Sequence, residues 1–288
     1  MTAVTTTTTR PSGAAEAPSA ARSAAPSLFG QALAAAAALP QEDLYGPLGA
    51  RVYDAVAARD TAEVALVARL ARRARARGPV VDLAAGSGRF TLALAARASS
   101  VLAVDTAPAM LGLLADRLAA APDAIARRVV LRRDDATTTD LPDGTALVVL
   151  GATSISLLPA VGRARLLASV AAALAPDGRL LVSAHVAAPT ADEEAVELLA
   201  LPQDGLLATF VERVDVAAAR REVLVLPSVV DGRPVAPVAL RSIVGVVAAG
   251  TVEREALAAG LAVLGRHPLP AAGASGDAVV LELGRAVA

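Results

Sequence analysis

The sequence predicts an α/β fold, a doubly wound and mostly parallel sheet with an antiparallel β elaboration near the C-terminus. Between residues 80 and 184, short runs of fully apolar residues alternate with helical patterns, which is typical of parallel strands covered by helices on both faces. Beyond residue 186 this rhythm stops. Apolar and polar residues then alternate around an Asp231-Gly232 turn, which indicates antiparallel strands.

The expected elements follow this division along the chain. Residues 1–27 are small, polar and interrupted by proline, a composition that predicts a disordered tail. Residues 28–60 hold two helical segments, 61–185 the α/β core, 186–247 the antiparallel insertion, and 248–288 a helix and a strand that complete the core. Within them we expect strands at 80–84, 101–104, 129–132, 146–150, 179–184, 209–214, 221–226, 238–247 and 278–283, and helices at 28–38, 48–58, 61–77, 90–97, 108–120, 160–174 and 252–264.

Composition excludes several classes of function. The formal net charge is −1, so the chain lacks the cationic field that binds nucleic acid or an anionic membrane. Cysteine is absent and every basic residue is arginine, which excludes thiolate chemistry, Schiff bases and the lysine of a P-loop. With two histidines, no metal centre is expected. We find no signal peptide or membrane span and expect a cytoplasmic protein.

The most informative stretch is Val80-Val81-Asp82-Leu83-Ala84-Ala85-Gly86-Ser87-Gly88-Arg89-Phe90. A strand that runs into two glycines and then a helix presents backbone N–H groups to a ligand at the helix N-terminus. A dinucleotide fingerprint would require a third glycine where Thr91 stands, which weakens the interpretation as a nicotinamide site. Taken alone, the two glycines favour an ordinary strand-to-helix turn, because such short matches are common.

Acidic residues at the ends of the next two strands favour a nucleoside site. Asp105 follows the strand that begins at Val101, and Asp135-Ala136 follows the strand that begins at Val129. A carboxylate at the end of the strand adjacent to a glycine turn can accept hydrogen bonds from both ribose hydroxyls. The carboxylate after the third strand can meet an adenine amino group.

These motifs resemble those of the class I methyltransferases that use S-adenosylmethionine, which implies a Rossmann-like sheet and that cofactor. The family's acidic-x-Gly-x-Gly-x-Gly turn is similar to this chain's turn, with Ala84 in place of the first glycine. By this resemblance Asp105 holds the ribose, Met110 contacts adenine and Asp135-Ala136 form the adenine pair. An acidic residue often found on the family's fourth strand is missing, since Ala146 or Leu147 stands there. The implied cofactor-binding residues are Asp82, Ala84, Gly86, Ser87, Gly88, Asp105, Thr106, Met110, Asp135, Ala136 and Gly151.

A narrower resemblance concerns residues 82–89 and the Ser/Thr-rich segment 149–158, which look like those of the methyltransferases of daptide biosynthesis. That resemblance implies N-methylation, in fact dimethylation, of an amine on a ribosomally made peptide. A small-molecule N- or O-methyltransferase is the alternative. A nicotinamide-dependent oxidoreductase and a non-catalytic nucleoside-binding protein are further alternatives, because a fold does not guarantee turnover.

Two residues, His185 and Tyr45, are candidates for catalysis. An amine acceptor must lose a proton, and His185, at the expected end of the fifth strand, is the best-placed neutral base; packing or capping explains this histidine equally well. Tyr45 and Tyr53 lie in the segment 28–60, which in this family closes over the cofactor as a lid, and aromatic rings suit a cationic ligand. We expect the insertion 186–247 to cover the acceptor.

Overall fold

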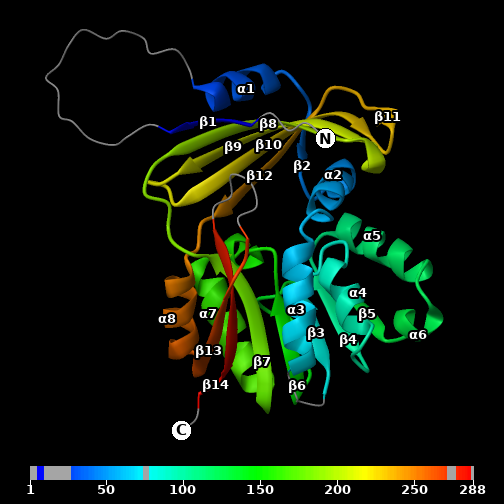
Figure 1. Ribbon diagram of the computed structural model, residues 1–288, viewed down its shortest axis with the longest axis vertical. Coiled ribbons are helices and arrows are strands. Elements are labelled where there is room, and N and C mark those ends of the chain that lie inside the picture. The colour runs from blue at the N-terminus through cyan, green and yellow to red at the C-terminus, as the bar shows by residue number, and fades with distance from the viewer. Residues whose placement is uncertain (1–4, 10–26, 74–77, 271–276, 287–288) are drawn as a thin grey trace, which may run out of the picture. The chain divides into compact units, whose positions relative to one another are not determined.

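A computed structural model describes residues 5–9, 27–73, 78–270 and 277–286 of the chain (Figure 1). The chain divides into two compact units. The first, called here the antiparallel unit, comprises residues 1–55 and 189–246, and the second, the α/β unit, comprises residues 56–188 and 247–288. No helix within the described part of the chain is both long and apolar enough to cross a membrane.

The described residues of the α/β unit form a seven-stranded sheet in the order β13-β14-β7-β6-β3-β4-β5. The five strands from β5 to β7 run parallel, and β14 and β13 complete the sheet in antiparallel pairing. The predicted doubly wound, mostly parallel sheet is therefore confirmed. The strands are β3 (Val80–Leu83), β4 (Val101–Asp105), β5 (Val129–Arg133), β6 (Thr145–Leu150), β7 (Leu174–His185), β13 (Leu261–Pro268) and β14 (Ala278–Arg285).

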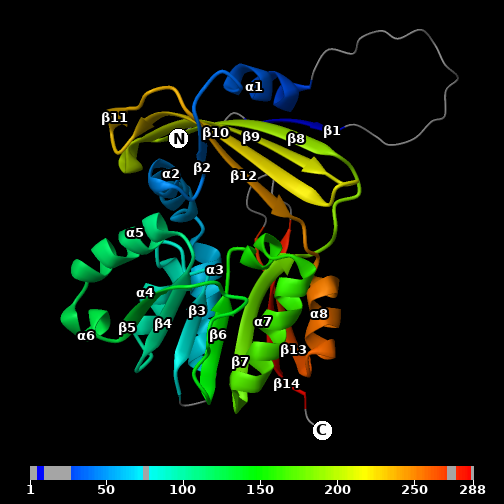
Figure 2. The ribbon, with the colours of Figure 1, turned by 180° about the vertical axis from the view of Figure 1, so that it is seen from behind.

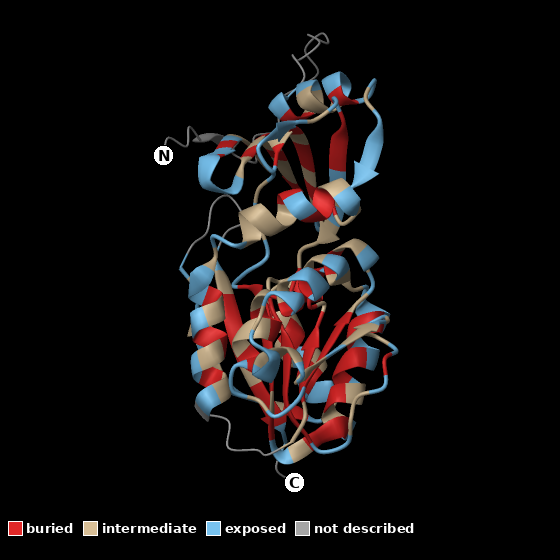
Figure 3. Cartoon of the chain, turned by 90° about the vertical axis from the view of Figure 1, so that its right-hand side faces the viewer, coloured by how far each residue is buried: buried red, intermediate tan, exposed pale blue. Residues whose placement is uncertain are grey.

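Helices cover both faces of this sheet, as Figures 1 and 2 show from opposite sides. Side chains of β7 alternate between the two faces: Leu180 and Val182 join the cluster beneath α7 and α8, whereas Leu181 joins the cluster beneath α3 and α4. The inner strands are accordingly buried along most of their length, whereas the edge strands β5 and β13 are largely half-buried or exposed (Figure 3). The helices are α3 (Thr61–Arg73), α4 (Arg89–Ala95), α5 (Pro108–Ala119), α6 (Asp123–Ala126), α7 (Ala160–Ala173) and α8 (Ala249–Ala258), with a 3-10 turn, η1, at Ser154–Leu157.

The strand order reverses beside β3, and we call the expected ligand position at the carboxyl end of the sheet there the crevice. From β3 the chain continues to β4 and β5 on one side, and then returns to add β6 and β7 on the other. Open α/β sheets bind ligands where the strand order reverses in this way. The turn after β3 and the loop after β6 therefore flank the expected ligand site.

One expected helix is shorter in the structure. We predicted a helix over 252–264, but α8 ends at Ala258 and Leu261 begins β13. Gly260 has φ +82°, the left-handed conformation in which glycine commonly ends helices. The apolar residues after it pair with β14 and form an edge strand of the sheet.

The antiparallel unit contains a second sheet, with the order β1-β8-β9-β10-β12-β2 and β11 beside β10. Helix α1 covers one face of it, where Phe29 packs with Val211 and Leu224. The alternating pattern of residues 209–247 thus correctly indicated antiparallel strands. The elements are β1 (Thr5–Thr9), α1 (Leu28–Ala36), β2 (Gln41–Asp43), α2 (Pro47–Ala57), β8 (Glu193–Leu201), η2 (Pro202–Asp204), β9 (Leu206–Asp215), β10 (Arg220–Val230), β11 (Arg233–Pro234) and β12 (Ala239–Gly245).

The expected disordered tail at residues 1–27 is wrong for Thr5–Thr9. These residues form β1, antiparallel to Glu193–Glu197 of β8, because the edge of a sheet offers unpaired backbone groups to an extended segment and threonine favours extended backbone. The tail residues 1–4 and 10–26 lie outside the described residues. That residues 28–60 act as a lid and 186–247 as an acceptor cover stays a prediction.

Candidate functional site

The turn after β3 is built from alternating left-handed residues. Ala84, Gly86 and Gly88 have φ values of +52°, +55° and +90°, and these are the three positions at which the acidic-x-Gly-x-Gly-x-Gly pattern has glycine. Ala84 adopts the conformation despite its Cβ, at a cost of roughly 1–2 kcal/mol. The turn then leads into α4, whose N-cap is Gly88.

The glycines of the site differ in what surrounds them. A Cβ on Gly88 would lie 2.1 Å from Cδ1 of Leu114, and one on Gly151 would lie 2.2 Å from the Phe90 ring. Packing therefore requires glycine at both positions. At Gly86, by contrast, no atom of the described residues other than those of Gly86 and its chain neighbours lies within 4 Å of an added Cβ. The backbone is thus open to a ligand at Gly86.

Asp105 joins the ends of β3 and β4. One oxygen of its carboxylate accepts a hydrogen bond from the Gly86 N–H at 2.8 Å, and the other accepts one from the Ala107 N–H at 2.8 Å. An ionised carboxylate has about four acceptor positions, so both oxygens can accept further hydrogen bonds. Asp105 and Gly86, predicted separately from two motifs, are therefore neighbours at the crevice.

Three further predicted residues, two after β4 and one in the glycine turn, are divided between surface and core. Thr106 is exposed, and its carbonyl accepts a hydrogen bond from Arg133. Met110, on α5, is buried. Ser87 is buried, and Arg117 donates to its carbonyl and its hydroxyl.

Asp135 and Ala136 follow β5 in a tight turn. The Asp135 side chain is exposed and accepts a hydrogen bond from the Thr137 N–H at 2.8 Å, as in an Asx turn. Ala136 packs against the core cluster that includes Leu150. The turn lies beside the end of β4, because the Asp134 N–H donates to the Asp105 carbonyl at 3.2 Å.

Asp82 is fully buried. Its Oδ2 accepts a hydrogen bond of 2.5 Å from the Thr91 hydroxyl on α4, while no donor among the described residues reaches Oδ1. Burial raises the pKa of Asp82 to about 7, because removal from water disfavours the charged form. Asp82 therefore holds the glycine turn against α4 rather than lining the open side at Gly86.

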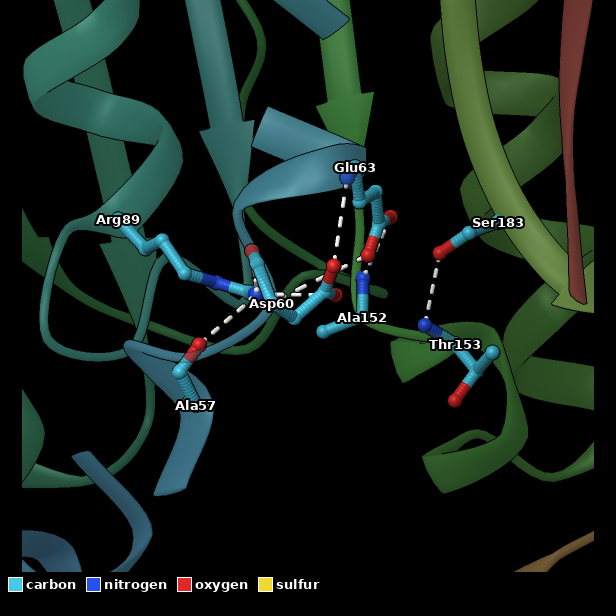
Figure 4. Close-up of polar contacts among 7 residues, drawn as sticks. All are labelled: Ala57, Asp60, Glu63, Arg89, Ala152, Thr153 and Ser183. Carbon is cyan, nitrogen blue, oxygen red and sulfur yellow. Dashed lines mark hydrogen bonds and ion pairs between the residues drawn. The ribbon is translucent and has the colours of Figure 1, made fainter. Parts of the chain in front are cut away.

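Two residues of the loop after β6 also have a left-handed backbone conformation. Ala152 and Thr153 have φ values of +54° and +51°, a conformation that costs roughly 1–3 kcal/mol at each non-glycine residue. Two buried side chains accept hydrogen bonds from this loop: the Ala152 N–H donates to Glu63 Oε1 at 2.9 Å, and the Thr153 N–H donates to Ser183 Oγ at 2.7 Å (Figure 4).

Glu63, near the start of α3, was not found from the sequence. It is 2 % exposed, and burial raises the pKa of its carboxyl group above the usual range. Arg89 lies 3.8 Å from Glu63 and donates to the Ala57 and Asp60 carbonyls and to the Asp60 carboxylate (Figure 4). The sequence offered two signals for this contact: an arginine directly after Gly88 and an acidic residue in the first turn of α3.

The two candidate catalytic residues lie in different units. His185 ends β7 in the α/β unit, is 7 % exposed, and donates its backbone N–H to the Val247 carbonyl. Tyr45 belongs to the antiparallel unit and packs edge-on against Tyr53, with ring centroids 5.6 Å apart. Burial raises the pKa of Tyr45 to about 12, so this phenol stays protonated at neutral pH.

Comparisons with known proteins agree on one kind of domain. Residues 80–178 match the family model described as a methyltransferase domain. Among solved structures, the glycopeptide N-methyltransferase MtfA complexed with S-adenosyl-L-methionine is 27% identical, with a TM-score of 0.55, over 78% of this chain and 93% of that chain. A search of curated proteins found no match.

Two further structures resemble the fold at lower identity. The CcbJ methyltransferase from Streptomyces caelestis is 22% identical, with a TM-score of 0.68, over 85% of this chain and 99% of that one. CalS10, an amino pentose methyltransferase from Micromonospora echinaspora involved in calicheamicin biosynthesis, is 22% identical, with a TM-score of 0.56, over 76% of this chain and 90% of that one.

Substituting Asp82 by Asn should change how stability depends on pH. Because burial raises the pKa of Asp82 from 3.8 to about 7, the folded protein binds this proton more tightly than the unfolded chain, and stability falls as pH rises through that window. Asn does not titrate and still accepts from Thr91. We expect the free energy of unfolding of Asp82→Asn, relative to the wild type, to rise by about 2–3 kcal/mol between pH 5 and pH 8.

Urea unfolding at the two pH values measures this difference. Asp116→Asn, at an exposed position of α5, is the control and should show no such change. A difference between Asp82→Asn and the wild type that stays constant with pH would contradict the raised pKa.

Proposed function

We propose that this chain, a class I methyltransferase whose methyl donor is S-adenosylmethionine, methylates an amine of a peptide natural product. The observation that carries the proposal is the open backbone at Gly86 beside the Asp105 carboxylate, within the matched methyltransferase domain. The resemblance to a glycopeptide N-methyltransferase supports an amine as the acceptor.

The strand ends offer a partner for each part of the donor. Asp105 would accept hydrogen bonds from the ribose hydroxyls while it still holds the Gly86 and Ala107 amides. Asp135, which is exposed after β5, would accept from the adenine amino group, and Met110 would contact the adenine ring. Asp82, Gly88 and Gly151 would support the backbone of the site by packing or hydrogen bonding and not by contact with the donor. We assign the donor site to Asp82, Ala84, Gly86, Ser87, Gly88, Asp105, Thr106, Met110, Asp135, Ala136 and Gly151.

S-Adenosylmethionine supplies a methyl group on a sulfonium, and a neutral nucleophile displaces it in line. The protein therefore has to align acceptor and donor and to exclude water, and needs no covalent intermediate. An amine is a cation at neutral pH and must first lose a proton. We assign this step to His185 as general base, or to an apolar pocket that lowers the pKa of the amine.

The acceptor we favour is a primary amine at the C-terminus of a ribosomally made peptide, which would gain two methyl groups. The support for it is the likeness of residues 82–89 and 149–158 to the daptide methyltransferases together with the N-methyltransferase neighbour. A small-molecule amine or hydroxyl is the alternative acceptor. Both use the same donor site, so the acceptor assay separates them.

Replacing Asp105 by Ala should weaken donor binding. Two charge-assisted hydrogen bonds to the ribose would be lost, at a cost on the order of 2–4 kcal/mol, or about 30- to 1000-fold in affinity. Isothermal titration calorimetry with S-adenosylmethionine measures the loss. Asp105→Asn, which keeps one oxygen acceptor for the Gly86 N–H, should lie between Ala and the wild type, and Asp116→Asn should bind normally. Unchanged affinity in Asp105→Ala would refute the assignment.

A matched pair of peptides tests the acceptor. We expect a peptide that ends in a primary amine to gain two methyl groups, as seen by mass spectrometry, and the same peptide ending in a carboxylate to gain none. An amino sugar and a catechol complete the panel. Methylation of the catechol or the amino sugar while neither peptide reacts would refute the peptide acceptor and leave methyl transfer itself standing.

Replacing His185 by Ala should slow turnover about 10- to 1000-fold if this residue is the base. The pH optimum should move upward, because the reaction would then depend on the fraction of amine that is already neutral. His267→Ala is a matched control, since His267 is the other histidine of the chain and lies 3.1 Å from Glu282 on β14. Equal kcat and pH profiles in His185→Ala and the wild type would exclude the role.

A further inference from the structure

The loop after β6 follows a strand that lies between the strand leading to the proposed donor site and the strand that carries the proposed base. Strand β6 stands between β3, which leads into the glycine turn, and β7, which ends at His185. The backbone of Gly151 to Thr153 therefore forms the edge of the crevice between the proposed donor site and the proposed base. A shift of this backbone would change one side of the region in which donor and acceptor have to be aligned.

This backbone does not hold its conformation by residue preference alone. Ala152 and Thr153 are consecutive left-handed residues with side chains, and L-residues with a Cβ rarely adopt that conformation. Each of their amides is fixed by a buried acceptor from a different element, Glu63 of α3 for Ala152 and Ser183 of β7 for Thr153. The conformation of the loop thus depends on side chains distant in sequence.

Glu63 also connects the two edges of the crevice. Arg89 directly follows Gly88 at the end of the glycine turn, and lies 3.8 Å from the Glu63 carboxylate. The guanidinium is itself fixed by two carbonyls and by Asp60. A line of polar contacts therefore runs from the glycine turn through Arg89 and Glu63 to the Ala152 amide (Figure 4).

We propose that Glu63 is a positioning residue for methyl transfer, which holds the left-handed backbone at Ala152 and so fixes the crevice edge between the glycine turn and His185. This inference rests on the proposed function for its kinetic consequence. Glu63 is buried and bonded to protein atoms, so it acts through the loop and not by contact with the reacting atoms.

Substitution of Glu63 tests the proposal with two independent measurements. In Glu63→Ala, we expect hydrogen exchange of the Ala152 amide to accelerate at least 10-fold. We also expect kcat to fall at least 10-fold, with the Kd for S-adenosylmethionine changed less than 3-fold. Glu63→Gln, which retains an oxygen acceptor for the Ala152 N–H, should restore most of both properties.

A second substitution at the loop distinguishes positioning from general destabilisation. Glycine adopts positive φ without strain, so adding Ala152→Gly to Glu63→Ala should recover at least one third of the lost kcat. The matched control is Glu255→Ala, which removes another partly buried carboxylate of this unit, bonded to Arg163 at 2.7 and 2.8 Å between α8 and α7. It should lower the melting temperature but leave kcat and Ala152 exchange unchanged.

Specific results would overturn the proposal: unchanged Ala152 exchange in Glu63→Ala, no recovery of kcat by Ala152→Gly, or an equal loss of kcat in Glu255→Ala. Should Glu63→Ala not fold, Glu63→Met, which fills a similar volume but offers no oxygen acceptor to the Ala152 N–H, carries the same two measurements with the same expected losses. If the wild type methylates none of the acceptors in the panel, the proposed function fails on that result. Hydrogen exchange of the Ala152 amide in Glu63→Ala then decides by itself whether Glu63 holds the backbone at Ala152.

Discussion

The hydrogen bond from the Gly86 N–H to the Asp105 carboxylate is the contact on which the organisation of the crevice depends. It joins the turn after β3 to the end of β4, two strands that the chain connects only through α4. The same carboxylate accepts from the Ala107 N–H at the start of α5. A single side chain thus orients a glycine turn, a strand end and a helix start, while both of its oxygens remain able to accept from a ligand.

Arginines secure the backbone around this contact. Arg89 donates to two carbonyls between the end of α2 and the start of α3. Arg117 donates to the Ser87 carbonyl in the glycine turn, and Arg128 to the Ala95 carbonyl at the end of α4. Helix α4 and the turn before it are therefore held at both ends. A guanidinium presents several donors in a fixed plane, which suits it to carbonyls on neighbouring segments.

The sequence was most informative where one local pattern decided the structure. Mainly apolar runs located the five parallel strands, and the spacing of Gly86 and Asp105 correctly placed two distant residues side by side. Residues whose role depends on tertiary contacts were not found. Glu63 has the sequence signature of an exposed helical acid, and only the fold brings it to the Ala152 amide.

Pairing along sheet edges was equally hidden from sequence analysis. Glu193 and its neighbours in β8 carry charges that indicate a solvated segment, yet β8 pairs with β9 on one side and β1 on the other. The strand β13 follows a helical pattern without a polar break, and Gly260 alone marks the change. In both cases the partner strand, which lies elsewhere in the chain, decides the conformation.

Two buried acids near the crevice make its support sensitive to pH. Burial raises the pKa of Asp82 to about 7 and raises that of Glu63 as well. Both acids support backbone next to the crevice, one beneath the glycine turn and the other behind the loop after β6. Protonation of these two carboxyl groups would therefore alter the support of the crevice without touching the groups that face a ligand. Under the proposed function, a pH profile of methyl transfer would contain two contributions, the proton of the acceptor amine and the state of the buried acids, and variants at His185 and Asp82 would separate them.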